Sequence, residues 1–201
     1  MAQSTISKFA SSNSIVTTGW TNPTNAYADD TSYATAVPGK NLTVNSDYGF
    51  ADFTSADIPD NANIISVTMS ARVFNSSTTS NKTHGIQGRD TGANSGTEAT
   101  NTGNTAEATI TTTLAAGGVT LADLRSASTV LFARVRSSQG NSSTTTTSSL
   151  DWVNITVTYD PQAFAQAQAT IWRPSNTYAQ SLATIKVSSN GYAQAQAKIP
   201  Y

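Results

Sequence analysis

Strict alternation of apolar and polar residues is the feature that most limits what this chain can fold into. In residues 63–74 every second residue is apolar: Ile65, Val67, Met69, Ala71 and Val73. A period of two places successive side chains on opposite faces of a β-strand and has no equivalent in a helix. Residues 129–136 and 150–159 repeat the pattern, with Leu131, Ala133 and Val135 on one face of the former. These segments predict strands with one buried face.

Less regular runs predict further strands at residues 15–18, 41–44, 47–53, 83–89 and 107–113. Segments 90–103 and 139–149 are rich in Gly, Ser, Thr and Asn and are expected to be loops. Residues 121–125 predict a single helical turn. About eight strands in one domain favour an all-β fold, an antiparallel β-sandwich that is jelly-roll-like.

The composition supports an all-β fold and excludes several function classes. Thr, Ser and Asn number 33, 26 and 16 of 201 residues, and these residues disfavour helix interiors. Charged residues make up 11% and the net charge is −1, which argues against nucleic acid as a partner. Cysteine is absent, so disulfides and thiolate metal sites are excluded. No apolar stretch is long enough to span a membrane, and residues 1–8 lack the pattern of a secretory signal.

The composition changes at residues 160–161, an Asp-Pro pair, which predicts two domains, residues 1–160 and 161–201. The second carries a repeat with a period of 14 residues: FAQAQATI at 164–171, YAQSLATI at 178–185 and YAQAQAKI at 192–199. Each unit reads as an eight-residue strand followed by six turn residues. An even period keeps each residue type on the same face in every unit.

One face of each repeat strand carries small residues that end in Ile, and such a face buries too little apolar surface to fold alone. We therefore expect the segment to pair with other copies, as a homo-oligomer such as a trimer; a three-stranded meander on the first domain is the alternative. The residues expected at this interface are Phe164, Ala165, Ala167, Ala169, Ile171, Trp172, Tyr178, Ile185, Tyr192, Ala195 and Ile199. If exposed, the aromatic residues among them would instead form a platform for sugar rings.

The segment GWTNPTNAYADD at residues 19–30, with YAT at 33–35, GF at 49–50 and IP at 58–59, resembles structural proteins of tailed bacteriophages. The Ala-Gln repeat is similar to repeats at the ends of such proteins. The resemblance implies a virion component with a β-sandwich body on the head or tail surface. It brings no catalytic residues and no cofactor.

Candidates for chemistry are few. His84 is the only histidine, and we expect it to be packed or solvated rather than part of a hydrolase triad. Asp29 and Asp30 lack the spacing of a calcium loop and are expected to cap turns. Trp20 and Trp152 are expected in the core or at its closing end.

Arg134 and Arg136 share one face of a strand, for which a solvated surface is favoured over pairing with acidic neighbours.

We therefore expect a non-enzymatic virion structural protein, made in the host cytoplasm. A head decoration or head-fibre protein is favoured, with other virion proteins such as the major capsid or tail proteins as partners. A tail-fibre or receptor-binding protein, or a module that binds a host surface glycan, is the alternative. We expect no metal and no cofactor.

Overall fold

The computed structural model describes residues 3–15, 19–77, 82–90, 96–103, 105–114, 118–141, 146–161, 167–170 and 195–198. The chain divides into two compact units, Met1–Pro161 and Gln162–Tyr201. We call the first unit the body and the second the repeat unit. No helix among the described residues is long and apolar enough to cross a membrane.

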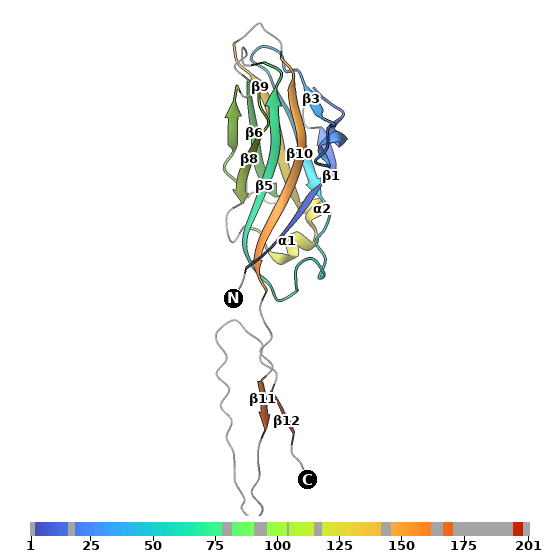
Figure 1. Ribbon diagram of the computed structural model, residues 1–201, viewed down its shortest axis with the longest axis vertical. Helices are drawn as coiled ribbons and strands as arrows, with labels where there is room; N and C mark the ends of the chain where they lie inside the picture. Colours follow the sequence, from blue (N-terminus) through green and yellow to red (C-terminus); the bar gives the residue numbers. More distant parts are fainter. Residues whose placement is uncertain are drawn as a thin grey trace, which may run out of the picture. The chain divides into compact units, whose positions relative to one another are not determined.

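The body is an antiparallel β-sandwich with jelly-roll topology (Figure 1). One sheet, sheet A, has the strand order β1-β10-β5-β8, and the other, sheet B, has the order β4-β9-β6-β7. This interleaved order is that of a double-sheet jelly roll. The strands are β1 (Ser4–Ile15), β4 (Thr43–Phe50), β5 (Asn63–Asn75), β6 (Lys82–Asp90), β7 (Ala99–Thr102), β8 (Ala108–Leu114), β9 (Leu131–Gln139) and β10 (Ser148–Asp160). The predicted all-β, jelly-roll-like sandwich is confirmed.

Short elements complete the body: β2 (Trp20–Thr21), the 3-10 helix η1 (Pro23–Ala26) and β3 (Ala34–Ala36). Strand β3 pairs with the start of β10 and with β2, so these elements extend sheet A. Helices α1 (Leu121–Arg125) and α2 (Ala127–Val130) lie at the end of the sandwich where the N-terminus lies (Figure 1). Thr120 and Asp123 form a capping box that fixes the start of α1.

Strand β1 belongs to both sheets. Its residues 4–9 pair with β10 in sheet A, and its residues 10–15 pair with β4 in sheet B. The register shifts between Ala10 and Ser12, where the strand passes from one sheet to the other. A local irregularity of this kind bends a strand and increases its twist, which closes one side of the sandwich.

Alternating residues from both sheets fill the core. Fully buried side chains include those of Tyr48, Phe50, Met69, Ile86, Leu131 and Ile155. Sheet A contributes inward residues of β5 and β10 in register, so that Val67 lies opposite Val157 and Met69 opposite Ile155. The burial of these large side chains is the main source of the body's stability.

Several predicted boundaries need correction. The strands predicted at 41–44 and 47–53 are replaced by the single strand β4 at Thr43–Phe50, which leaves out residues 41–42 and 51–53. They were separated because polar residues such as Ser46 face the interior and interrupt the apolar pattern. The expected loop 90–103 contains strand β7, an edge strand with no apolar alternation. Of the strand predicted at residues 15–18, Ile15 is the last residue of β1, and residues 16–18 lie outside the described part.

The repeat unit contributes two described strands, β11 (Ala167–Thr170) and β12 (Ala195–Lys198). They pair in parallel, with Ala167 opposite Ala195 and Gln168 opposite Gln196. The offset is 195 − 167 = 28 residues, which is two periods of the repeat. A three-stranded meander would place the second repeat strand between these two, whereas here the first and third are direct neighbours.

Candidate functional site

An arginine on the outer face of sheet A is the centre of a cluster of charged and aromatic side chains. The Nη1 atom of Arg72 in β5 lies 2.9 Å from Oδ2 of Asp151, 3.0 Å from Oδ1 of Asp29 and 3.5 Å from Oε2 of Glu107. Three carboxylates from separate parts of the chain therefore share one guanidinium group. Such a network fixes the side chains that form it more firmly than an isolated surface pair would.

Aromatic rings surround this arginine. Trp152 lies opposite Arg72 in the β5–β10 register, and the Cζ atom of Arg72 is 5.4 Å from its ring centroid. Phe9 of β1 meets the Trp152 ring edge-on with centroids 6.2 Å apart, and 42% of Phe9 is exposed. Cation–π and edge-to-face contacts of this kind hold ring planes in defined orientations.

A second aromatic pair adjoins the acidic residues. Tyr33 and Phe74 meet edge-on with centroids 5.0 Å apart, and the Tyr33 hydroxyl lies 3.3 Å from Oε1 of Glu107. Both rings are half-buried. We call the whole set the Arg72 cluster: Phe9, Asp29, Tyr33, Arg72, Phe74, Glu107, Asp151 and Trp152.

Two polar atoms of the Arg72 cluster are buried without a hydrogen-bond partner. They are Oδ1 of Asp151 and Nε1 of Trp152. Burial raises the pKa of the Asp151 carboxyl, and the hydrogen bond from Arg72 acts against that rise. Because both atoms are covered by protein, a ligand on this face would instead meet the carboxylates of Asp29 and Glu107, whose side chains are 50% and 43% exposed.

The outer face of sheet B carries paired charges rather than the solvated arginines that we expected. Arg134 donates to both carboxylate oxygens of Asp47 at 2.7 and 2.8 Å. Arg136 likewise contacts both carboxylate oxygens of Glu98. The sequence alternation could not reveal either partner, because Asp47 and Glu98 reach the arginines from other strands and loops.

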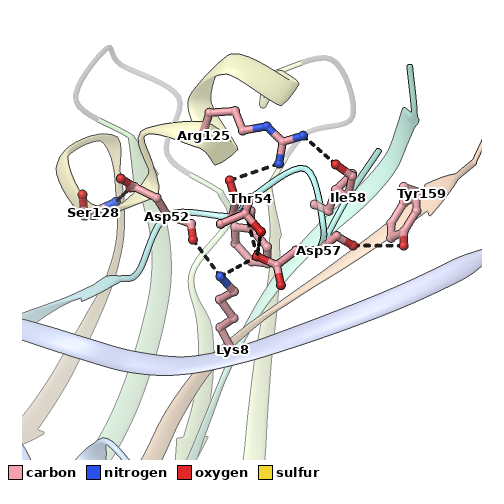
Figure 2. A network of polar contacts seen from close by, with 9 residues as sticks. Lys8, Asp52, Thr54, Asp57, Ile58, Arg125, Ser128 and Tyr159 are labelled. Carbon is pink, nitrogen blue, oxygen red and sulfur yellow. Dashed lines mark hydrogen bonds and ion pairs between the residues drawn. The ribbon is translucent and has the colours of Figure 1, made fainter. Parts of the chain in front are cut away.

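A polar network ties the loop between β4 and β5 to the end of the sandwich where α1 lies (Figure 2). The Nζ atom of Lys8 donates to the carbonyl of Asp52 at 2.7 Å and to Oδ2 of Asp57 at 2.9 Å. The Asp57 carboxylate also accepts from the backbone and the hydroxyl of Thr54. These hydrogen bonds lower the pKa of Asp57 to about 2, the Thr54 backbone bond contributing most.

Arg125 of α1 and Tyr159 of β10 complete this network. Arg125 donates to the backbone carbonyls of Phe53 and Ile58, and the Tyr159 hydroxyl donates to the carbonyl of Asp57 at 3.1 Å (Figure 2). All of these bonds satisfy backbone or side-chain groups within the protein. The network therefore fixes the shape of the loop.

The residues singled out for chemistry have structural roles. His84 is fully buried in β6 and faces the interior, so it is packed as expected and does not reach a surface where a substrate could bind. Oδ1 of Asp30 accepts from the backbone of Ser32, which is the turn-capping role expected of it. Trp20 and Trp152 are both buried. Among the described residues no group of three or more His, Asp or Glu side chains could hold a metal ion.

Three of the predicted interface residues lie in the two described strands of the repeat unit. Ala167 and Ala169 lie in β11 and Ala195 in β12, where the backbone alone is described. The other predicted interface positions fall outside the described residues: Phe164, Ala165, Ile171, Trp172, Tyr178, Ile185, Tyr192 and Ile199. The Arg72 cluster was missed because its members come from five separate segments of the chain.

No model of a known protein family matches the sequence, and no curated protein matches it. Among solved structures, the chain is similar to one described as "CBM4 structure and function", with a TM-score of 0.39, 11% identity, and coverage of 75% of this chain and 92% of that chain. It is also similar to a family 11 carbohydrate-binding module from Clostridium thermocellum in complex with a mixed-linked tetrasaccharide, with a TM-score of 0.37, 11% identity, and coverage of 76% and 87%.

Proposed function

We propose that this protein is a non-enzymatic structural protein of a tailed-phage virion, in which the repeat unit joins copies of the chain and the body is displayed. Within the virion we favour a head decoration or head fibre. The resemblance of residues 19–30 and of the Ala-Gln repeats to such virion proteins supports the setting. The repeat itself supports the proposal that the repeat unit joins copies of the chain.

The observation that carries the proposal is the parallel, in-register pairing of β11 with β12. Alanine lies opposite alanine and glutamine opposite glutamine in this pair. A strand of this sequence is thus compatible with a parallel neighbour of the same sequence, and a second copy of the chain supplies such neighbours. Because small residues bury little apolar area in one chain, pairing between chains is the way to remove more of it from water.

Charge is also consistent with attachment by this segment. The repeat unit carries Arg173, Lys186 and Lys198 and no acidic residue, which gives +3. The rest of the chain carries eight basic and twelve acidic residues, 8 − 12 = −4. A basic segment on an acidic body is suited to an acidic surface of another virion protein.

Light scattering after size-exclusion chromatography tests the joining role. We expect the full chain to be an oligomer such as a trimer, and residues 1–161 alone to be monomeric while still melting cooperatively. The double variant Ala167→Asp/Ala195→Asp places like charges along the paired strands and is expected to dissociate the oligomer. Ser11→Asp/Thr113→Asp adds the same charge at exposed body positions and is the matched control. A monomeric full chain would overturn the proposal.

Electron microscopy of particles labelled with an antibody against the body tests the setting. Label on the head supports a decoration or head-fibre role. Label on the tail supports the tail-fibre or receptor-binding alternative, and unlabelled particles would contradict both.

A second candidate function is glycan binding, and the Arg72 cluster favours it. Exposed Phe9 and half-buried Tyr33 offer rings for sugars to pack on, while the exposed carboxylates of Asp29 and Glu107 offer hydrogen-bond acceptors in the same cluster. We expect Phe9→Ala and Tyr33→Ala each to weaken retention on host surface polysaccharide about tenfold, the loss of one stacking contact. Arg134→Ala on the opposite sheet should leave retention unchanged. No retention of the intact protein would exclude this function.

A further inference from the structure

The interior of the body contains a group of polar side chains where a sandwich core is ordinarily apolar. We call it the inner polar cluster: Asn75, Lys82, His84, Ser137 and Ser148. None of these residues is more than 1% exposed. They come from both sheets, since β5 and β10 belong to sheet A and β6 and β9 to sheet B.

Strand register and hydrogen bonds bring the cluster together. His84 lies opposite Ser137 in sheet B, and Asn75 lies opposite Ser148 in sheet A. The hydroxyls of Ser137 and Ser148 are 2.6 Å apart, which joins the two sheets directly. Ser148 also donates to Oδ1 of Asn75 at 3.2 Å. Lys82 and His84 are two residues apart in β6 and so point to the same side of sheet B.

The polar atoms that remain unmatched are mainly donors. Nζ of Lys82, Nδ2 of Asn75 and both ring nitrogens of His84 are buried without a hydrogen-bond partner. All twelve Asp and Glu residues of the chain lie among the described residues, and none of them forms an ion pair with Lys82 there. A buried cation without a counter-charge is strongly destabilising, so this arrangement calls for a negative partner.

Loss of the lysine proton does not remove the need for a negative partner, because Lys82 stays mostly protonated. Burial lowers the pKa of Lys82 to about 8, so the ammonium group still predominates at neutral pH. Burial, with a smaller contribution from the charge of Lys82, lowers the pKa of His84 to about 4. The histidine is therefore neutral at pH 7 and offers one N–H donor.

We propose that the inner polar cluster binds a small inorganic anion of the halide class, held by the ammonium group of Lys82 together with N–H donors of Asn75 and His84. A halide accepts hydrogen bonds from several directions and neutralises the lysine. A water molecule alone would meet donors but leave the charge unbalanced. The site is independent of the proposed virion role.

Melting of the full chain in sodium bromide and in sodium gluconate, at one ionic strength, tests the site. An anion that binds only the folded state raises the melting temperature by about 3–6 °C when its concentration reaches ten times the dissociation constant. Crystals grown in bromide should show an anomalous peak within about 3.5 Å of the Lys82 Nζ atom. Water alone at that position would overturn the proposal.

Variants distinguish anion binding at this site from general effects of salt on the melting temperature. Lys82→Met is expected to lose the shift between bromide and gluconate, whereas Lys40→Met, at an exposed lysine, should keep it. Asn75→Asp supplies an internal counter-charge without changing side-chain shape, and should also lose the shift. The Asn75→Asp variant keeps the test decisive if Lys82→Met fails to fold. An equal shift in the wild type and these two cluster variants would overturn the proposal.

Discussion

The guanidinium group of Arg72 donates to the buried carboxylate of Asp151 at 2.9 Å across the β5–β10 strand pair. Asp151 is only 1% exposed, whereas Arg72 retains contact with solvent. Arg72 and Asp151 therefore differ in their exposure to solvent. Removal of the arginine leaves a charge in the interior, while removal of the aspartate leaves a cation that water can reach.

From this relationship we predict that Arg72→Met destabilises the body by about 2–3 kcal/mol at pH 7, measured by urea unfolding. Arg134→Met is the matched control and should cost about 1 kcal/mol or less, since its partner Asp47 is more exposed. The deficit of Arg72→Met should shrink as the pH falls, because the buried Asp151 carboxyl, whose pKa is already raised, becomes neutral. Equal costs for the two variants would contradict this explanation.

A second prediction concerns the pH dependence of stability at Asp57. Its folded pKa of about 2 lies below its usual value of 3.8, so the stabilisation is present above pH 4 and is lost as the pH falls towards 2. We expect Asp57→Asn to cost about 1 kcal/mol at pH 7 and almost nothing at pH 2, by thermal melts. Asp60→Asn changes a carboxylate that is 80% exposed and should have little effect at either pH. A pH-independent deficit would point to a packing effect.

The sequence was sufficient to predict the strands whose two faces differ in polarity. Alternation predicted strands at 63–74, 129–136 and 150–159, and the structure has β5 at Asn63–Asn75, β9 at Leu131–Gln139 and β10 at Ser148–Asp160. The helical turn predicted at residues 121–125 is α1. In each case local preference and burial favour the same structure.

Strand β1 was missed because its burial differs along its length. Its residues 4–9 face one partner strand and its residues 10–15 another, so no single apolar stripe runs through it. Strand β6 was predicted only weakly for a different reason. Its inward positions include Lys82, His84 and Gly88, which no apolar pattern would assign to a core.

The Arg72 cluster could not be predicted, because it depends on register. Arg72 and Trp152 are 80 residues apart in sequence, 152 − 72, and meet only because β5 pairs with β10. The bulge between Leu150 and Trp152 also changes which residues of β10 face outward. Alternation in the sequence identifies the faces of a strand but not the strand that lies beside it.

A third prediction uses the single histidine as a probe. We expect the imidazole signals of His84 to titrate with a midpoint near pH 4 in a halide-free gluconate buffer, well below the usual 6.5. Because the folded pKa of this base is depressed, stability is complete above pH 6.5 and falls as the pH drops towards 4. The loss reaches about 3 kcal/mol over that window. His84→Gln should remove this pH dependence, and a midpoint near 6.5 would show that the imidazole is hydrated.

A fourth prediction compares two glycines on opposite faces of β6. Gly88 faces the core, where an added Cβ would lie 2.8 Å from Cδ2 of Leu114 and 3.2 Å from Sδ of Met69. Both neighbours are buried in sheet A, so neither can move away without disturbing the packing. Gly88→Ala is therefore expected to destabilise the body by about 1–3 kcal/mol in urea unfolding.

Gly85 is the matched control, because the three atoms nearest to an added Cβ there belong to the Glu98 and Arg136 side chains on the outer face of sheet B. These side chains are flexible and partly exposed, so they can rotate away at the loss of one surface ion pair, about 1 kcal/mol or less. The unfolding free energies should rank wild type first, Gly85→Ala second and Gly88→Ala last. The reverse order of the two variants would mean that the ion pair on sheet B stabilises the sandwich more than the close packing between its sheets.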